Sequence, residues 1–179
     1  MPKKVVIVSS SPRKDGNSDI LAQEFARGAR DAGHCAEIIN VRDMQLKFCT
    51  GCMSCMKRDG CILDDGMNAV YGTIRDADAL VFASPVYYYA VSGQLKTFLD
   101  RLNPLYGRKN NFKDVYLLSA SAEDDEAAMD GSVKDIQGWT DCFDGVKLAG
   151  VLRGTGLEAR GDVKDTDFPE KAYNMGKNV

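Results

Sequence analysis

The sequence predicts an α/β fold in which a parallel β-sheet lies between two layers of helices. Short apolar runs rich in β-branched residues alternate along the chain with segments whose apolar residues recur at helical spacing. Such continuous apolar runs are typical of strands buried on both faces of a parallel sheet. The chain has 179 residues, of which 44% are hydrophobic and 27% are charged, so it can form a globular core. We therefore expect a single domain over residues 1–179 with five parallel strands.

Five apolar runs are the expected strands, and they cover residues 5–8, 36–41, 79–83, 115–118 and 148–152. Glu37 and Asn40 make the second run partly polar, which suits an edge strand. Apolar residues at helical spacing predict helices within residues 21–32, 65–74, 91–102, 129–143 and 168–175. These elements fit a flavodoxin-like three-layer α/β/α sandwich with a five-stranded parallel sheet in the order 2-1-3-4-5. In that order the loops after the first and third strands meet at the switch point where ligands bind.

The charge and the first residues of the chain exclude several classes of protein. The formal net charge is −3, so a basic surface for nucleic acid or for an anionic membrane is not expected. The apolar run Val5–Val8 is too short for a signal peptide or a membrane span, so we expect a cytoplasmic protein. In that reducing compartment cysteines favour metal or catalytic roles over disulfides. The single histidine, His34, excludes histidine-rich metal sites.

Four of the six cysteines, Cys49, Cys52, Cys55 and Cys61, have the spacing C-x2-C-x2-C-x5-C. Residues 48–62 form an insertion between the second strand and its helix. Bacterial ferredoxins use a similarly tight opening for an iron–sulfur cluster, whereas structural zinc sites separate two C-x2-C pairs by a longer insert. We expect a cluster first, then free thiols or one labile disulfide, and zinc last. Cys35 and Cys142 are expected to be packing thiols.

The loop over residues 9–18 joins the first strand to its helix and carries the groups that suit a phosphate. It offers hydroxyls, an amide and a cation from Ser9, Ser11, Arg13, Asn17 and Ser18. A helix N-terminus with hydroxyls and a cation is a good phosphate site. Asp15 and Asp19 are unfavourable near an anion, so we expect them to point outward. The alternative is a polar turn that only caps the helix. No G-x-G-x-x-G is present, which disfavours a dinucleotide fold.

Two segments resemble a known family. The segment Ser11–Ser18 resembles the phosphate loop of NADPH-dependent FMN reductases of the flavodoxin-like superfamily. The segments Ser84–Tyr88 and Ser92–Arg101 resemble the second flavin loop of that family and the helix that follows it. With the cysteine motif added, the chain is most similar to iron–sulfur flavoproteins. The resemblance covers about residues 3–105.

This resemblance implies FMN as a cofactor and a set of residues that bind it. The implied contacts are Ser9, Ser11, Pro12, Arg13, Asn17 and Ser18 for the phosphate, and Pro85, Val86, Tyr87 and Tyr88 for the ring and ribityl chain. A third loop, residues 119–126, lacks the usual glycines, and only Ser121 is named there. Residues 154–156 could line the same rim or form a simple turn. Cys49, Cys52, Cys55 and Cys61 would be the ligands of a [4Fe–4S] cluster.

The resemblance also implies an enzyme, an NAD(P)H-dependent, FMN reductase-like oxidoreductase. Electrons would pass from NAD(P)H to a small acceptor such as a quinone, an azo or nitro compound, or a flavin, or through the cluster to or from a redox protein. One alternative is an electron-transfer iron–sulfur flavoprotein that exchanges electrons with ferredoxin without NAD(P)H. A second is a thiol-based redox sensor. We predict no catalytic acid or base, because the enzyme mainly positions its cofactors. A homodimer or homotetramer is implied as well.

Overall fold

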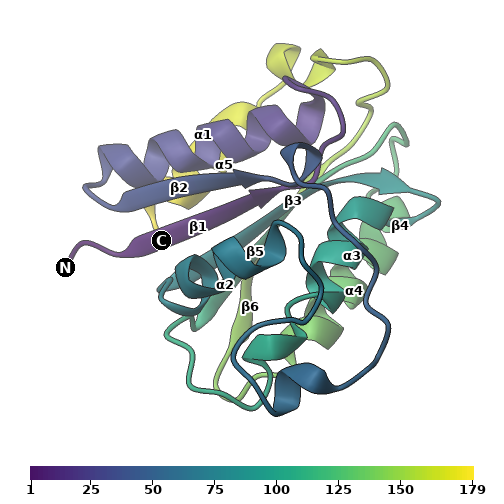
Figure 1. The fold of residues 1–179 in the computed structure, drawn as a ribbon. Coiled ribbons are helices and arrows are strands. Elements are labelled where there is room, and N and C mark those ends of the chain that lie inside the picture. The colour runs from purple at the N-terminus through teal and green to yellow at the C-terminus, as the bar shows by residue number, and fades with distance from the viewer.

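The computed structural model describes all residues, 1–179, and has an α/β/α architecture (Figure 1). Five parallel strands lie in the order β2-β1-β3-β5-β6. They are β1 (Lys4–Ser9), β2 (Cys35–Asn40), β3 (Ala79–Tyr87), β5 (Asp114–Ala120) and β6 (Lys147–Gly154). In chain order this is the predicted 2-1-3-4-5 arrangement. The structure adds a sixth strand that was not predicted, β4 (Ala90–Val91), which pairs antiparallel with the end of β3.

The burial of each strand follows its sequence. Val5, Ile7 and Val8 of β1 are fully buried, because β1 lies inside the sheet between β2 and β3. β2 alternates between exposed and partly buried residues, which confirms the prediction of an edge strand. Because β1, β3 and β5 run parallel, their carboxyl ends reach the same edge of the sheet, where their loops can form one site.

Helices cover both faces of the sheet (Figure 1). α1 (Asn17–Asp31) and α5 (Phe168–Lys177) lie on one face, and α2 (Met67–Arg75), α3 (Gly93–Asp100) and α4 (Asp130–Thr140) lie on the other. None of these helices has the length and apolar character that a bilayer crossing requires.

Each face of the sheet has its own apolar core. On the side of α1 and α5, Ile7 and Val81 pack with Leu21 and Phe25. On the other side the core is aromatic, and Trp139 contacts Phe82 edge to face with ring centroids 5.3 Å apart. Both cores run up to the edge that carries the loops after β1 and β3, so this edge rests on a rigid base.

Candidate functional site

The loop after β1 turns tightly into α1 and leaves the first turn of that helix without a side-chain cap. Gly16 makes this turn possible, because a Cβ there would lie 2.7 Å from Ser11 Oγ and 3.1 Å from the Arg13 carbonyl oxygen. The first N–H groups of a helix have no partner inside the helix, and the helix dipole adds partial positive charge there. The end of α1 is thus able to bind an anion.

The hydroxyl groups of this loop differ in what they contact. Ser9 Oγ donates to Asp19 Oδ1 at 2.6 Å, and Ser11 Oγ donates to the Arg13 carbonyl oxygen at 2.8 Å. Ser18 is 1% exposed, and its hydroxyl has no hydrogen-bond partner in the protein. A buried hydroxyl without a partner is uncommon and costs free energy. Among the predicted phosphate contacts, Ser18 is therefore the hydroxyl left free for a ligand.

The expectation that Asp19 points outward is wrong. Its carboxylate is buried beneath the loop, accepts from Ser9, and pairs with Arg42 at 2.9 Å. Arg42 belongs to the 3-10 turn that follows β2 (Val41–Asp43) and supplies the charge that makes this burial possible. Burial raises the pKa of Asp19, but hydrogen bonds from Ser9, Arg42 and the Asp15 N–H outweigh it, so the pKa lies below its usual range. Asp15 is partly exposed, with Arg160 at 3.5 Å.

The second loop forms a hairpin between β3 and β4 whose turn is unusual. Tyr88 and Tyr89 both have left-handed backbone conformations, with φ of 50° and 62°. Such turns normally carry Asn and Gly, because bulky side chains are strained at positive φ. The Tyr89 carbonyl packs against Gly131 of α4, where a Cβ would lie 2.0 Å away. The Tyr88 side chain is fully exposed.

Serine side chains join the first loop to the second. Ser92 Oγ donates to Ser10 Oγ at 3.0 Å, and Ser10 Oγ donates to the Ala83 carbonyl oxygen at 2.9 Å. The Ser92 N–H donates to Ser84 Oγ at 2.9 Å. All of these serines are buried. This network fixes the spacing of the two loops on which the predicted site depends.

The two loops enclose a cavity of about 110 Å³. It is lined by many of the predicted flavin contacts, namely Ser11, Pro12, Arg13, Asn17, Ser18, Pro85, Val86 and Tyr87. Ser9, Tyr88 and Ser121 do not line it, and their roles stay predictions. Sequence analysis missed Ala120, Ala122, Leu157 and Glu158, which complete the lining. For Leu157 and Glu158, the sequence signal was that they come directly after residues 154–156, which follow the fifth predicted strand.

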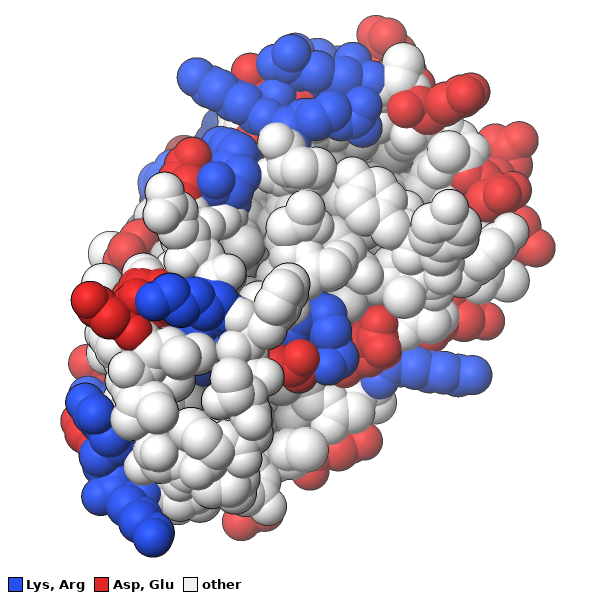
Figure 2. All heavy atoms as spheres, turned by 45° about the vertical axis from the view of Figure 1, so that its right-hand side comes forward, with Lys and Arg blue, Asp and Glu red and all other residues white.

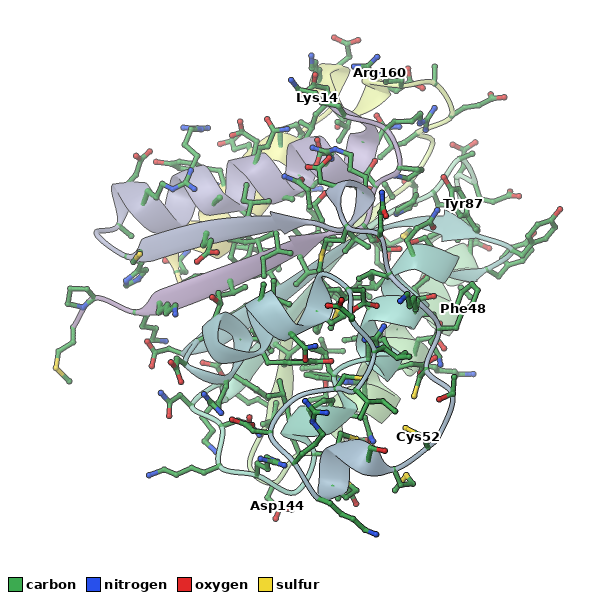
Figure 3. The ribbon with its side chains drawn as sticks, in the orientation of Figure 1. Lys14, Phe48, Cys52, Tyr87, Asp144 and Arg160 are labelled. Carbon is green, nitrogen blue, oxygen red and sulfur yellow. The ribbon has the colours of Figure 1, made fainter.

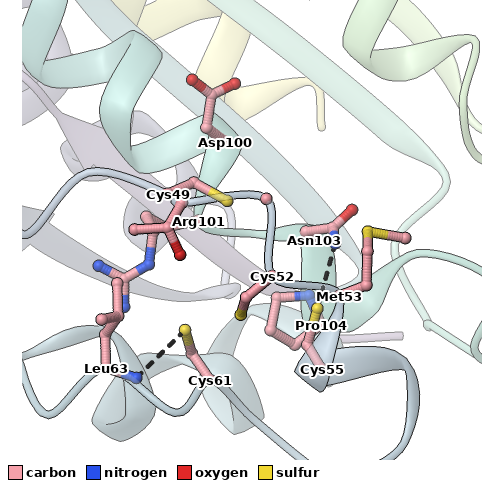
Figure 4. A pocket seen from close by; sticks show the side chains of 12 residues that line it. Cys49, Cys52, Met53, Cys55, Cys61, Leu63, Asp100, Arg101, Asn103 and Pro104 are labelled. Atoms are coloured by element: carbon pink, nitrogen blue, oxygen red, sulfur yellow. Dashed lines mark hydrogen bonds between the residues drawn. The ribbon is translucent and has the colours of Figure 1, made fainter.

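The four clustered cysteines line a second, smaller cavity of about 20 Å³ between the loop after β2 and the end of α3 (Figure 4). Asn103 Nδ2 donates to Cys55 Sγ at 3.1 Å, and the Leu63 N–H donates to Cys61 Sγ at 3.5 Å. No group of three or more histidine, cysteine or acidic side chains is arranged to hold a metal ion. The four predicted ligands thus line one cavity, but their thiols are not arranged as a metal site would require.

The two cysteines outside the loop were expected to be packing thiols, and the structure corrects this expectation. Cys35 and Cys142 are both exposed and are not packing thiols, because β2 is an edge strand and Cys142 lies just beyond the end of α4. Within the loop, Cys52 is also exposed. Hydrogen bonds from the Ser54 side chain and backbone lower the pKa of the Cys52 thiol. A lowered pKa favours the thiolate, which is the form that binds metals and reacts with oxidants.

Arg101 and Asp65 anchor both ends of the cysteine loop. The two side chains are almost fully buried, and the guanidinium forms two hydrogen bonds to the carboxylate. Arg101 Nη1 also donates to the Lys47 carbonyl oxygen, and the Lys47 N–H donates to Asp65 Oδ2. Burial raises the pKa of Asp65, but the contacts with Arg101, Lys47 and Met67 outweigh it and leave the pKa low. Sequence analysis gave Arg101 no role, because its partners lie far away along the chain.

Comparison with known proteins shows the family of the chain. The family model for NADPH-dependent FMN reductases matches residues 3–139. An iron–sulfur flavoprotein of Methanocaldococcus jannaschii is 30% identical over 186 residues, covering 98% of this chain and 95% of that protein. An iron–sulfur flavoprotein of Archaeoglobus fulgidus is 29% identical over 180 residues, covering 98% of this chain and 78% of that protein.

Solved structures share the fold at lower sequence identity. An NAD(P)H:quinone oxidoreductase from Methanothermobacter marburgensis has a TM-score of 0.76 and 18% identity, covering 99% of this chain and 97% of that chain. The azoreductase AzrA has a TM-score of 0.74 and 16% identity, covering 98% and 99%. The match to the family model extends over most of the chain. The chain therefore belongs to the NADPH-dependent FMN reductase family and is an FMN-dependent oxidoreductase.

Proposed function

We propose that the chain binds FMN in the cavity between the loops after β1 and β3, and that it transfers electrons from NAD(P)H to a small acceptor. The acceptor class is a quinone, an azo or nitro compound, or a flavin. One observation carries this proposal: the buried Ser18 hydroxyl has no partner and lines a cavity at an uncapped helix N-terminus. A phosphate at this position would give the hydroxyl an acceptor and would meet the dipole of α1.

The residues around Ser18 fit the rest of the cofactor. Arg13 lines the same cavity and adds a cation for the phosphate. Pro85, Val86 and Tyr87 supply the apolar side, which suits a ring system and the chain attached to it. FMN bound there would supply a group that takes up an electron pair from a nicotinamide and passes it on. The protein's own part is to bind, to orient and to exclude side reactions.

We also propose that Cys49, Cys52, Cys55 and Cys61 hold a [4Fe–4S] cluster, which would let the chain exchange single electrons with a redox protein such as a ferredoxin. The support is that all four thiols line one cavity and that Cys55 and Cys61 already accept N–H hydrogen bonds. Hydrogen bonds to sulfur are one of the features that tune such clusters. Residues 49–61 would have to draw their thiols together to become ligands.

The chain is further proposed to form a homodimer or homotetramer through the face that carries β4 and the cysteine loop. This face has broad uncharged areas, with a band of charged side chains across its middle and further charges toward its edges (Figure 2). Phe48 and Tyr88 are large apolar residues that are 77% and fully exposed there. An exposed patch of this kind is typical of an interface.

A reducing cytoplasm would suit the six free cysteines.

Anaerobic purification followed by absorbance, iron and sulfide analysis tests both cofactors together. We expect about one FMN and about four irons per chain. Cys55→Ser should lose the iron and keep the FMN, whereas Cys35→Ser, a change at an exposed thiol outside the loop, should keep both. Flavin without iron in the wild-type chain would refute the cluster and leave the cysteine loop as a thiol sensor. Absence of flavin after FMN is added would refute the central proposal.

A further inference from the structure

We infer that the Asn17 side chain has a positioning role: it holds residues 157–163 as one wall of the flavin cavity and does not itself contact the FMN phosphate. The inference rests on the proposed FMN site and changes the role that the sequence resemblance gave to this residue. It arises from the contacts of the Asn17 side chain, which is almost fully buried and hydrogen-bonds to the chain beyond β6.

All hydrogen-bonding groups of the Asn17 amide are used within the protein. Nδ2 donates to the carbonyl oxygens of Leu157 at 3.1 Å and Ala159 at 2.9 Å. Oδ1 accepts from the N–H groups of Gly161 at 3.0 Å and Val163 at 3.3 Å. An amide has two donors and one acceptor oxygen with two lone pairs, so these four bonds leave nothing for a ligand. Binding a phosphate oxygen would require Asn17 to release a backbone carbonyl in the interior.

The segment that Asn17 holds is part of the cavity. Leu157 is buried and Glu158 is exposed, and both line it. On its other side the segment is tied to the third loop, because the Leu157 N–H donates to the Ser121 carbonyl oxygen at 2.8 Å. Asn17 is thus the link that joins this wall to the first loop, over a separation of 140 residues or more.

The ion pair between these two loops is weak. Arg160 and Asp15 approach to 3.5 Å, but both side chains are about half exposed. Exposed ion pairs of this kind contribute little, because solvent screens them. Figure 3 shows Lys14 and Arg160 at the same outer edge of the molecule. Without the Asn17 amide, the wall would keep its hydrogen bonds to the third loop and the packing of Leu157 and Val163 in the apolar core, but it would lose its buried hydrogen bonds to the start of α1.

Asn17 and Ser18 are neighbours with opposite properties, and this gives a direct experiment. The Ser18 hydroxyl is free for a phosphate, whereas the Asn17 amide is committed to the wall. FMN has a phosphate and riboflavin does not, but both have the ribityl chain and the ring that the wall would enclose. Flavin-free wild type, Asn17→Ala and Ser18→Ala would be titrated with FMN and with riboflavin below their melting temperatures.

For Ser18→Ala we expect FMN affinity to fall about tenfold while riboflavin affinity stays within about twofold, because one hydrogen bond to a charged group is lost. For Asn17→Ala we expect both affinities to fall by a similar factor of about ten. If Asn17→Ala weakens FMN alone, Asn17 is a phosphate ligand and the inference is overturned. If neither variant changes either affinity, the inference fails as well. A wild-type chain that binds neither flavin contradicts the proposed site itself.

A second measurement needs no variant and covers the case in which Asn17→Ala does not fold. The side-chain amide protons of Asn17 can be followed by NMR in the wild-type chain before and after FMN is added. We expect them to exchange slowly in the flavin-free protein, together with the N–H groups of Gly161 and Val163, since all of these groups are bonded and buried. Fast exchange that slows only when FMN binds would show that the ligand, and not the wall, is their partner.

Discussion

At the scale of single residues, the first loop combines a committed amide, a free hydroxyl and a buried ion pair within three consecutive positions, Asn17, Ser18 and Asp19. The sequence could identify Asn17 and Ser18 as predicted phosphate contacts, because their types and their position at the start of a helix are local properties. It could not assign their partners. Asp19 meets Arg42 from 23 residues away, and Asn17 meets carbonyls more than 100 residues away. Burial of a charge depends on such distant groups, which is why the predicted outward direction of Asp19 was wrong.

The pair between Asp19 and Arg42 predicts a pH-dependent contribution to stability. Because the pKa of Asp19 is lower in the folded than in the unfolded chain, the contribution is present above the unfolded pKa and is lost as pH falls through the folded pKa. Asp19→Asn should lower the free energy of unfolding by about 3 kcal/mol at neutral pH, because it removes the buried partner of Arg42 and leaves only the exposed Asp43 near it.

Urea unfolding of both proteins at neutral pH and in acid checks this expectation. The difference between wild type and Asp19→Asn should shrink as the pH falls below the folded pKa of Asp19. Asp43→Asn is a suitable control, because Asp43 is 71% exposed and lies 3.9 Å from the same arginine. A difference that stays constant down to acid pH would mean that the Asp19 carboxylate does not stabilise the fold.

At the scale of elements, local patterns predicted what depends on the local sequence. The five parallel strands were found because each is a continuous apolar run, and β2 was recognised as the edge by its polar residues. The strand β4 was missed, because Tyr88-Tyr89 is not a recognised hairpin turn and only the packing of Tyr89 on Gly131 shows how it is held. Leu157 and Glu158 were missed because residues 154–156 mark only the end of the fifth strand, whereas the contacts that make the next residues a wall come from distant parts of the chain.

The turn between β3 and β4 is expected to store strain. Replacing Tyr88-Tyr89 by Asn-Gly should raise the free energy of unfolding of the monomer by about 1–3 kcal/mol, since the new residues accept positive φ more easily. Denaturant unfolding at low protein concentration measures this, and sedimentation of the same variant would show whether self-association weakens. A loss of monomer stability would instead mean that the tyrosine side chains make stabilising contacts within the chain.

Helices α1 and α5 are expected to be sensitive to any added methyl group at their crossing. A Cβ at Gly28 would lie 1.9 Å from the Tyr173 carbonyl oxygen, and one at Gly176 would lie 2.0 Å from that of Phe25. Gly28→Ala should therefore destabilise the protein by about 1–3 kcal/mol despite the better helix propensity of alanine.

The matched control is Gly138→Ala on α4, where nothing lies within 4 Å of the new Cβ. This change should stabilise the protein by about 0.5–1 kcal/mol, because it adds helix propensity without a clash. Thermal unfolding of both variants would decide the point. Equal effects of the two substitutions would show that the close crossing of α1 and α5 does not limit the packing.

At the scale of the whole molecule, the flavin cavity and the cysteine cavity lie toward opposite ends of one helix, α3. Ser92, which caps α3 and donates to Ser10, belongs to the network beside the flavin cavity. Asp100 and Arg101, at the other end of that helix, line the cysteine cavity. Sequence analysis predicted both sites from their motifs, yet the helix that joins them follows only from the three-dimensional arrangement. A rigid element between two redox sites would keep their separation fixed.

The most direct test of the account is to mix the FMN-loaded protein with NADPH, and separately with NADH, in the absence of oxygen and to follow the flavin absorbance. We expect at least one nicotinamide to bleach the flavin band and a quinone then to restore it. Ser18→Ala, loaded at the same FMN concentration, should show a smaller change because less flavin is bound. If bound flavin stays oxidised with both nicotinamides, the proposed NAD(P)H-dependent activity is contradicted.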